Sequence, residues 1–148
     1  MESDIENLLN NDSEISALFK KLVVPIKIKS CGEGIRALYY IPDQEIWIDP
    51  TITDENALKE SLLHEYIHAY DDQINQLSIT TLKGLAKAEI HAMKLCECKN
   101  SMYPRLETKL MAIQAVSLSI NNPKLAEEIV DSVFDETYDD DFASTLFD

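Results

Sequence analysis

Apolar residues at the start of the chain recur at helical intervals, with one interruption. The repeat covers residues 4–22, and a polar cluster at residues 10–13 breaks it. Ser13 is a good N-cap because its hydroxyl can accept a hydrogen bond from a backbone N–H of the first turn. We therefore expect a loosely ordered stretch over residues 1–12 and then a helix that begins near Ser13.

The repeat changes after this helix. Residues 24–28 alternate apolar and polar side chains, which is the two-residue period of a strand. Two further apolar runs, residues 38–41 and 45–49, flank Pro42 and the polar residues after it, which is typical of a hairpin. The pattern predicts a small antiparallel sheet of about three strands.

The rest of the chain returns to helical spacing. We expect helices over residues 53–75 (with Thr53 as N-cap), 81–98, 102–120 and 123–134, and a loosely ordered acidic tail over 136–148. The predicted inward-facing residues of the last two helices are Leu106, Leu110, Ile113, Ile120, with Val116 at the edge, and Leu125, Ile129 and Val133. The fold class is therefore α+β, in a single domain spanning residues 1–148.

Charge and cysteine content narrow the function. The formal net charge of −14 argues against nucleic acid as a partner and disfavours tight contact with anionic lipid. No apolar run reaches the roughly 18 residues that span a bilayer, so we expect any membrane association to be peripheral. We find no presequence and no transmembrane segment in the sequence. The three cysteines, Cys31, Cys96 and Cys98, allow at most one intramolecular disulfide and are interpreted as structural or single reactive thiols.

The strongest chemical signal lies inside the helix expected over 53–75. His64, Glu65 and His68 form an H-E-x-x-H sequence. Two histidines four residues apart lie on one face of a helix and can bind one metal ion, and Glu65 is placed as a general base beside it. This set lacks one protein ligand of a catalytic zinc site.

Glu89 is the candidate for that third ligand. It lies in the middle of the apolar face of the helix expected over 81–98, opposite to the lysines of that helix and to His91. An ionised carboxylate buried there needs a cation from another element. The alternatives are that Glu89 pairs with Arg36 or Arg105, or caps a backbone. His91 itself is expected on the surface.

Together these motifs resemble the mitochondrial ATP-synthase-assembly metalloprotease family, also known as the Ku-binding protein family. The resemblance rests on residues 64–71 (HEYIHAYD), residues 88–92 (AEIHA) and the ending at 130–135 (VDSVFD). It implies a zincin-like fold, with the small sheet packed on the active-site helix and three helices following. It also implies one catalytic Zn²⁺ on His64, His68 and Glu89, with Asp71 as a partner that orients a histidine or as an alternative ligand.

The resemblance also implies a protein substrate and a location. Members of the family face the mitochondrial intermembrane space, where they mature an ATP-synthase membrane subunit and assist its assembly. This chain departs from the family at three positions: His91 replaces an arginine, and Asp49 and Lys87 replace cysteines. A mitochondrion-related organelle is therefore an alternative location, and the sequence leaves the oligomeric state open.

We expect the chain to be a zinc-dependent endopeptidase in which Glu65 moves the proton. Residues 45–49 would pair with extended substrate, and Tyr39, Tyr40, Tyr66 or Tyr103 would donate to the oxyanion. The first alternative is a non-proteolytic assembly factor that keeps a structural zinc site. A metal-dependent regulator that cleaves an antirepressor is a second alternative, and it fits less well because we see no DNA-binding segment.

Overall fold

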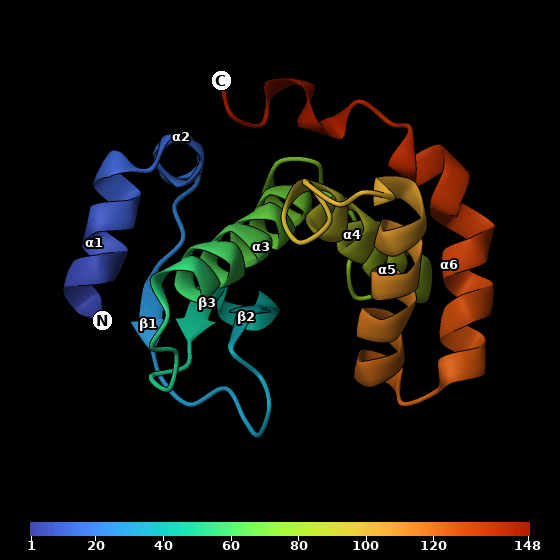
Figure 1. The fold of residues 1–148 in the computed structure, drawn as a ribbon, viewed down its shortest axis with the longest axis horizontal. Coiled ribbons are helices and arrows are strands. Elements are labelled where there is room, and N and C mark those ends of the chain that lie inside the picture. Colours follow the sequence, from blue (N-terminus) through green and yellow to red (C-terminus); the bar gives the residue numbers. More distant parts are fainter. The chain divides into compact units, whose positions relative to one another are not determined.

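The structure is a computed structural model that describes residues 1–148. Six α-helices and one three-stranded sheet confirm the α+β class (Figure 1). The chain groups into two compact units, one made of residues 1–70 with 142–148 and the other of residues 71–141. No helix is both long enough and apolar enough to cross a membrane.

The first unit begins with two helices, and not with the loose stretch that the sequence suggested. Helix α1 covers Glu2–Asn11 and α2 covers Ser13–Lys21. Ile5 anchors α1 because its side chain is buried. The N-cap of α2 is Asp12, whose carboxylate accepts hydrogen bonds from the backbone N–H of Glu14 and Ile15 at 3.1 Å each. The prediction of Ser13 as the cap was wrong because Ser13 is already the first helical residue.

The sheet is mixed, and not antiparallel throughout as predicted. It contains β1 (Ile26–Ile28), β2 (Ala37–Tyr40) and β3 (Glu45–Ile48) in the order β1-β3-β2. β2 and β3 form the expected antiparallel hairpin, whereas β1 pairs with β3 in parallel. The alternation of apolar and polar residues predicts each strand correctly, but it does not predict which strands pair or in which direction. β3 is thus the central strand, and Ile46 and Ile48 are fully buried.

Helix α3 (Glu55–Gln73) carries the H-E-x-x-H sequence. The Asp54 carboxylate, and not Thr53, accepts from the backbone N–H of Ala57 at 2.9 Å at its start. Ten consecutive residues are buried or nearly so, from Leu62 to Asp71, with His64 the most accessible among them. A helix that is buried on all sides places its polar side chains in the protein interior, where they need partners.

The second unit contains three helices that pack together (Figure 1). They are α4 (Leu82–Leu95), α5 (Pro104–Ile120) and α6 (Pro123–Tyr138). Their shared core consists of Ala86, Ile90, Ala112, Val116, Ala126, Val130, Val133 and Phe134. Small residues dominate this list, which lets the three helices approach closely.

The predicted inward face of α5 was right in part, because Ile113 and Ile120 pack against the shared core, and wrong at its N-terminal half. Leu106 and Leu110 are exposed, whereas Thr108, Ala112 and Val116 are buried. On α6, Leu125 and Ile129 are only partly buried, and Ala126 and Val130 lie in the core in their place. Periodicity favours the larger apolar side chains, but the close packing here uses the smaller ones.

The acidic end of the chain is more regular than expected. Helix α6 continues to Tyr138, four residues beyond Phe134, and a 3₁₀ turn forms at Phe142–Thr145. Arg105 donates to Asp135 and Asp139, which fixes the last turns of α6. Leu146 is fully buried, and the Lys21 ammonium donates to the carbonyl oxygens of Thr145 and Leu146. The acidic end thus contains regular structure and one buried apolar side chain.

Candidate metal centre

Helix α3 presents His64 and His68 on one face, one turn apart. Their ring centroids are 4.7 Å apart, with one ring edge-on to the other. Glu65 and His68 are both 8% exposed, so the acid and one imidazole of the motif are shielded from solvent. Low solvent access strengthens the electrostatic interactions of such groups.

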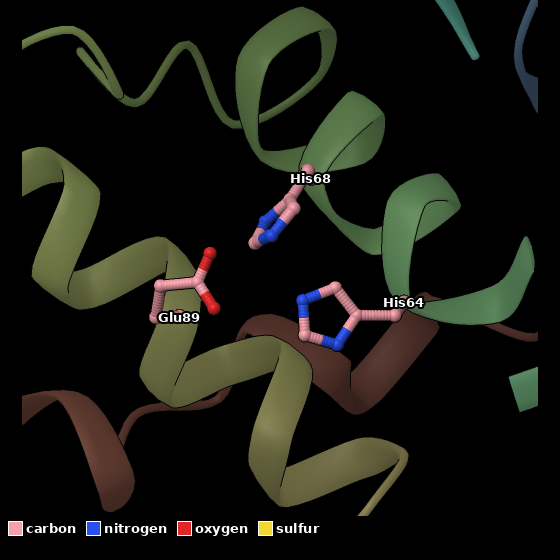
Figure 2. Close-up of side chains that lie close together, drawn as sticks. All are labelled: His64, His68 and Glu89. Atoms are coloured by element: carbon pink, nitrogen blue, oxygen red, sulfur yellow. The ribbon is translucent and has the colours of Figure 1, made fainter. Parts of the chain in front are cut away.

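Glu89 of α4 completes a group of three. One ligand atom from each of His64, His68 and Glu89 can be chosen so that all three lie within 4.8 Å of one another. Figure 2 shows the Glu89 carboxylate directed toward the two imidazole rings. The three residues that the sequence pattern selected as ligands are thus brought together. Glu89 is 9% exposed, as its place on an apolar helix face predicts.

This donor set fits a divalent metal ion, and zinc in particular. Zinc binds imidazole nitrogen and carboxylate oxygen at about 2.0–2.2 Å, and catalytic sites combine three such ligands with one open position. Two donors of one zinc ion therefore lie at most about 4 Å apart. The three chosen ligand atoms lie within 4.8 Å of one another, which is close to that spacing, so the cluster could hold a metal ion.

Asp71, the predicted orienting partner or alternative ligand, is not a member of this group. Its fully buried carboxylate accepts from His91 Nδ1 at 2.9 Å and from the Asn75 side chain at 2.9 Å. On the other side of the ring, His91 Nε2 donates to Asp140 at 2.7 Å. The structure therefore assigns Asp71 to His91, a pairing that the sequence did not suggest.

His91 was predicted on the surface and is buried, so that prediction was wrong. Because carboxylates only accept hydrogen bonds, an imidazole between two of them carries both ring protons. Burial alone would lower the pKa of His91, but its hydrogen bonds to Asp71 and Asp140 outweigh that effect and raise the pKa. The helical periodicity of α4 places His91 on the same side as the lysines of that helix. It does not show that Asp140, 49 residues later in the chain, covers His91.

The candidate oxyanion donors lie in different environments. Tyr66 is fully buried, its hydroxyl has no hydrogen-bond partner, and burial raises its pKa to about 12. Tyr39 is also buried, Tyr40 stacks on Trp47 with centroids 4.5 Å apart, and Tyr103 is exposed. Of the four, Tyr66 is the one carried by α3 itself, next to Glu65.

Cys31 is a free thiol. The backbone N–H of Cys31 donates to the Asp49 carboxylate at 3.0 Å, and burial followed by the charges of Asp49 and Glu65 raises the Cys31 pKa to about 11. The thiol is therefore protonated at neutral pH and is a poor nucleophile. Asp49 itself also accepts from the Thr51 hydroxyl at 2.6 Å.

The sheet corrects one further expectation. β3 was the candidate for pairing with extended substrate, but its two neighbours already occupy both of its edges. The edge strands of the sheet are β1 and β2.

Comparison with protein families gives a match over residues 2–142, nearly the whole chain, to a family described as Peptidase M76. The matched region includes His64, Glu65, His68 and Glu89, and the match confirms the resemblance drawn from the motifs. Neither a search of curated proteins nor a search of solved structures finds a match.

Proposed function

This chain belongs to the Peptidase M76 family, and we propose on that premise that it is a zinc-dependent endopeptidase of the H-E-x-x-H type. Family membership supports a peptidase with protein substrates. The observation that carries the finer proposal is the grouping of two imidazoles and a carboxylate, next in sequence to the buried Glu65.

His64, His68 and Glu89 would hold the zinc ion. When bound, zinc supplies a Lewis acid that polarises a peptide carbonyl and makes water more acidic. The Glu89 carboxylate adds a negative charge to two neutral imidazoles, so the ligand set partly balances the charge of the ion. With only three protein ligands, the ion would remain accessible to water or substrate.

Glu65 performs the proton transfers. Its carboxylate takes a proton from the attacking water and then delivers that proton to the leaving amine, because an amide nitrogen leaves readily only when it is protonated. A structural metal site requires no such base. The presence of Glu65 therefore favours an enzyme over the non-proteolytic assembly factor.

The substrate and location in this proposal rest on the resemblance between this chain and the mitochondrial ATP-synthase-assembly proteases. By that resemblance the substrate is the leader of an ATP-synthase membrane subunit, and the enzyme acts at the periphery of the mitochondrial inner membrane. The replacement of two family cysteines by Asp49 and Lys87 leaves a mitochondrion-related organelle as the alternative location.

The test is Glu65→Gln, compared with Glu60→Gln, which removes an exposed carboxylate from the same helix. We expect Glu65→Gln to lower kcat/KM for a quenched-fluorescence peptide library by about 10²–10⁴-fold, the usual contribution of a general base. Zinc content and the thermal unfolding midpoint should match the wild type. Undiminished cleavage by Glu65→Gln would refute the proposed role, and wild-type chain that binds zinc but cleaves nothing would favour the assembly factor.

A further inference from the structure

One apolar face of helix α5, together with the N-cap residue Tyr103, is covered only in part by the three-helix core. Its apolar and small residues recur at alternating intervals of three and four, at Tyr103, Leu106, Leu110, Ile113, Ser117 and Ile120. Ile113 and Ile120 pack against the edge of the core. The other three apolar residues are open to solvent, with exposed fractions of 63% for Tyr103, 58% for Leu106 and 55% for Leu110. We call Tyr103, Leu106 and Leu110 the α5 seam.

The α5 seam borders a groove on the surface of the second unit. The groove has a volume of about 500 Å³ and is lined by Met102, Tyr103, Pro104, Arg105, Leu106, Lys109, Phe134 and Asp135. Met102 is 83% exposed, so four large apolar side chains between residues 102 and 110 face water. A contiguous exposed apolar surface of this kind commonly marks an interaction site.

The spacing of the apolar residues in the seam indicates that the partner segment is an α-helix. Alternating intervals of three and four residues give the a/d pattern with which one α-helix packs against another. The residues of α5 that are buried in the second unit, Thr108, Ala112 and Val116, do not belong to the seam. A helix of matching apolar repeat can therefore lie along the seam without any change in the fold.

The charged side chains beside the seam indicate what charge the partner helix should carry. Arg105 pairs with Asp135 and Asp139 at 2.8 and 2.9 Å, and Lys109 pairs with Asp131 at 2.8 Å. Both cations beside the seam are thus already bound to carboxylates of α6.

The carboxylates beside the seam outnumber those two cations. The Asp135 side chain is 89% exposed, and Glu107 on α5 is a further exposed carboxylate. The net charge of −14 acts in the same direction at longer range.

We propose that the α5 seam binds an amphipathic α-helix of a partner protein, one with an apolar face flanked by lysine or arginine. This surface is separate from the proposed peptidase site and does not depend on it. A second copy of this chain would bring together two seams that are each bordered by an excess of carboxylates, and an anionic membrane would be repelled for the same reason. A basic helix satisfies both the apolar repeat and the charge.

The test uses a labelled peptide of about 18 residues, with Leu at the a and d positions and Lys at the others, and a matched Leu/Glu peptide. Binding to the full chain carrying Glu65→Gln, which keeps the peptide intact, is followed by fluorescence anisotropy. We expect the Leu/Lys peptide to bind, and Leu106→Asp to weaken that binding at least about tenfold, the size of an interface hot spot.

The matched control is Leu118→Asp. Leu118 is 80% exposed on the same helix but lies about 120° away from Leu106 around the helix axis. This variant adds the same charge, so its affinity should stay within about twofold of the parent chain. Tyr103→Asp provides a second seam variant if Leu106→Asp fails to fold, as judged by circular dichroism.

Three results would overturn the proposal. The first is equal loss of affinity in Leu106→Asp and Leu118→Asp, which would show attraction to the acidic chain in general. The second is equal binding of the Leu/Glu peptide, or no binding of either peptide. The third is a dimer in sedimentation velocity that Leu106→Asp dissociates, which would make a second copy the occupant.

Discussion

The three histidines of this chain all face carboxylates, but in two different arrangements. His64 and His68 lie with Glu89, while His91 lies between Asp71 and Asp140. The first arrangement was predictable because Glu89 is a carboxylate in the middle of an apolar face, and its burial requires a cation. The second was not predictable, because a helical wheel shows a face and not what covers it.

The His91 pairing should be important for stability. In His91→Leu the fully buried Asp71 carboxylate loses its imidazole partner, and we expect the free energy of unfolding to fall by about 2–4 kcal/mol. Urea denaturation measures this. His91→Arg should lose much less, because a guanidinium also presents several N–H donors to the two carboxylates. Equal stability of His91→Leu and wild type would contradict the pairing.

Asp49 makes stability depend on pH in the acid range. Hydrogen bonds from the Thr51 hydroxyl and the Cys31 backbone N–H lower its pKa below the ordinary 3.8. Because the pKa of the Asp49 carboxylate is lower in the folded chain than in the unfolded chain, the carboxylate stabilises the fold at any pH above its unfolded pKa. This stabilisation is lost as the pH falls through the folded pKa, where the carboxylate becomes protonated. The difference in melting temperature between wild type and Asp49→Ala should therefore be constant near pH 7 and shrink below about pH 4.

The matched control for this experiment is Asp43→Ala, at an exposed position of the same hairpin. Its melting-temperature difference from wild type should be small at every pH, because an exposed side chain contributes little to stability. A difference for Asp49→Ala that grows as the pH falls would contradict the assignment.

At the scale of elements, sequence periodicity located every strand and the four long helices. The short helix α1 was missed because its apolar residues are few and a polar cluster follows them. What periodicity could not give was the choice of partner, which depends on tertiary packing. The parallel pairing of β1 with β3 and the use of Ala112 and Val116 in place of Leu106 and Leu110 are both of this kind.

The start of α4 depends on a glycine. A Cβ on Gly84 would lie 1.8 Å from the carbonyl oxygen of Ser78, and that oxygen also accepts from the Thr81 hydroxyl at 2.7 Å. Gly84→Ala must therefore push the first turn of α4 away from the preceding loop, although alanine favours helices. We expect a loss of at least about 1–3 kcal/mol in the free energy of unfolding, measured by urea denaturation.

The neighbouring substitution Lys83→Ala controls for helix propensity, because Lys83 is exposed. It should change stability by no more than about 0.5 kcal/mol. A Gly84→Ala chain as stable as the wild type would mean that the loop and the helix approach less closely than described.

For the whole molecule, composition indicated an acidic globular protein and periodicity indicated the α+β class, which the structure confirms. The family match over residues 2–142 agrees with the motifs that suggested a peptidase. The motif residues lie together because buried polar side chains on α3 and α4 need partners. The exposed α5 seam was not predictable, since the same repeat in sequence is typical of a core-facing helix.

The central claim is that this chain is a zinc enzyme, and the most direct measurement is zinc per chain by native mass spectrometry after reconstitution. The matched variants are Glu89→Ala, Asp71→Ala, and Glu136→Ala as an exposed control. We predict about one zinc per chain in the wild type, in Asp71→Ala and in Glu136→Ala, and a large loss in Glu89→Ala. Absence of zinc from the wild type, or full zinc content in Glu89→Ala, would contradict the proposed metal centre.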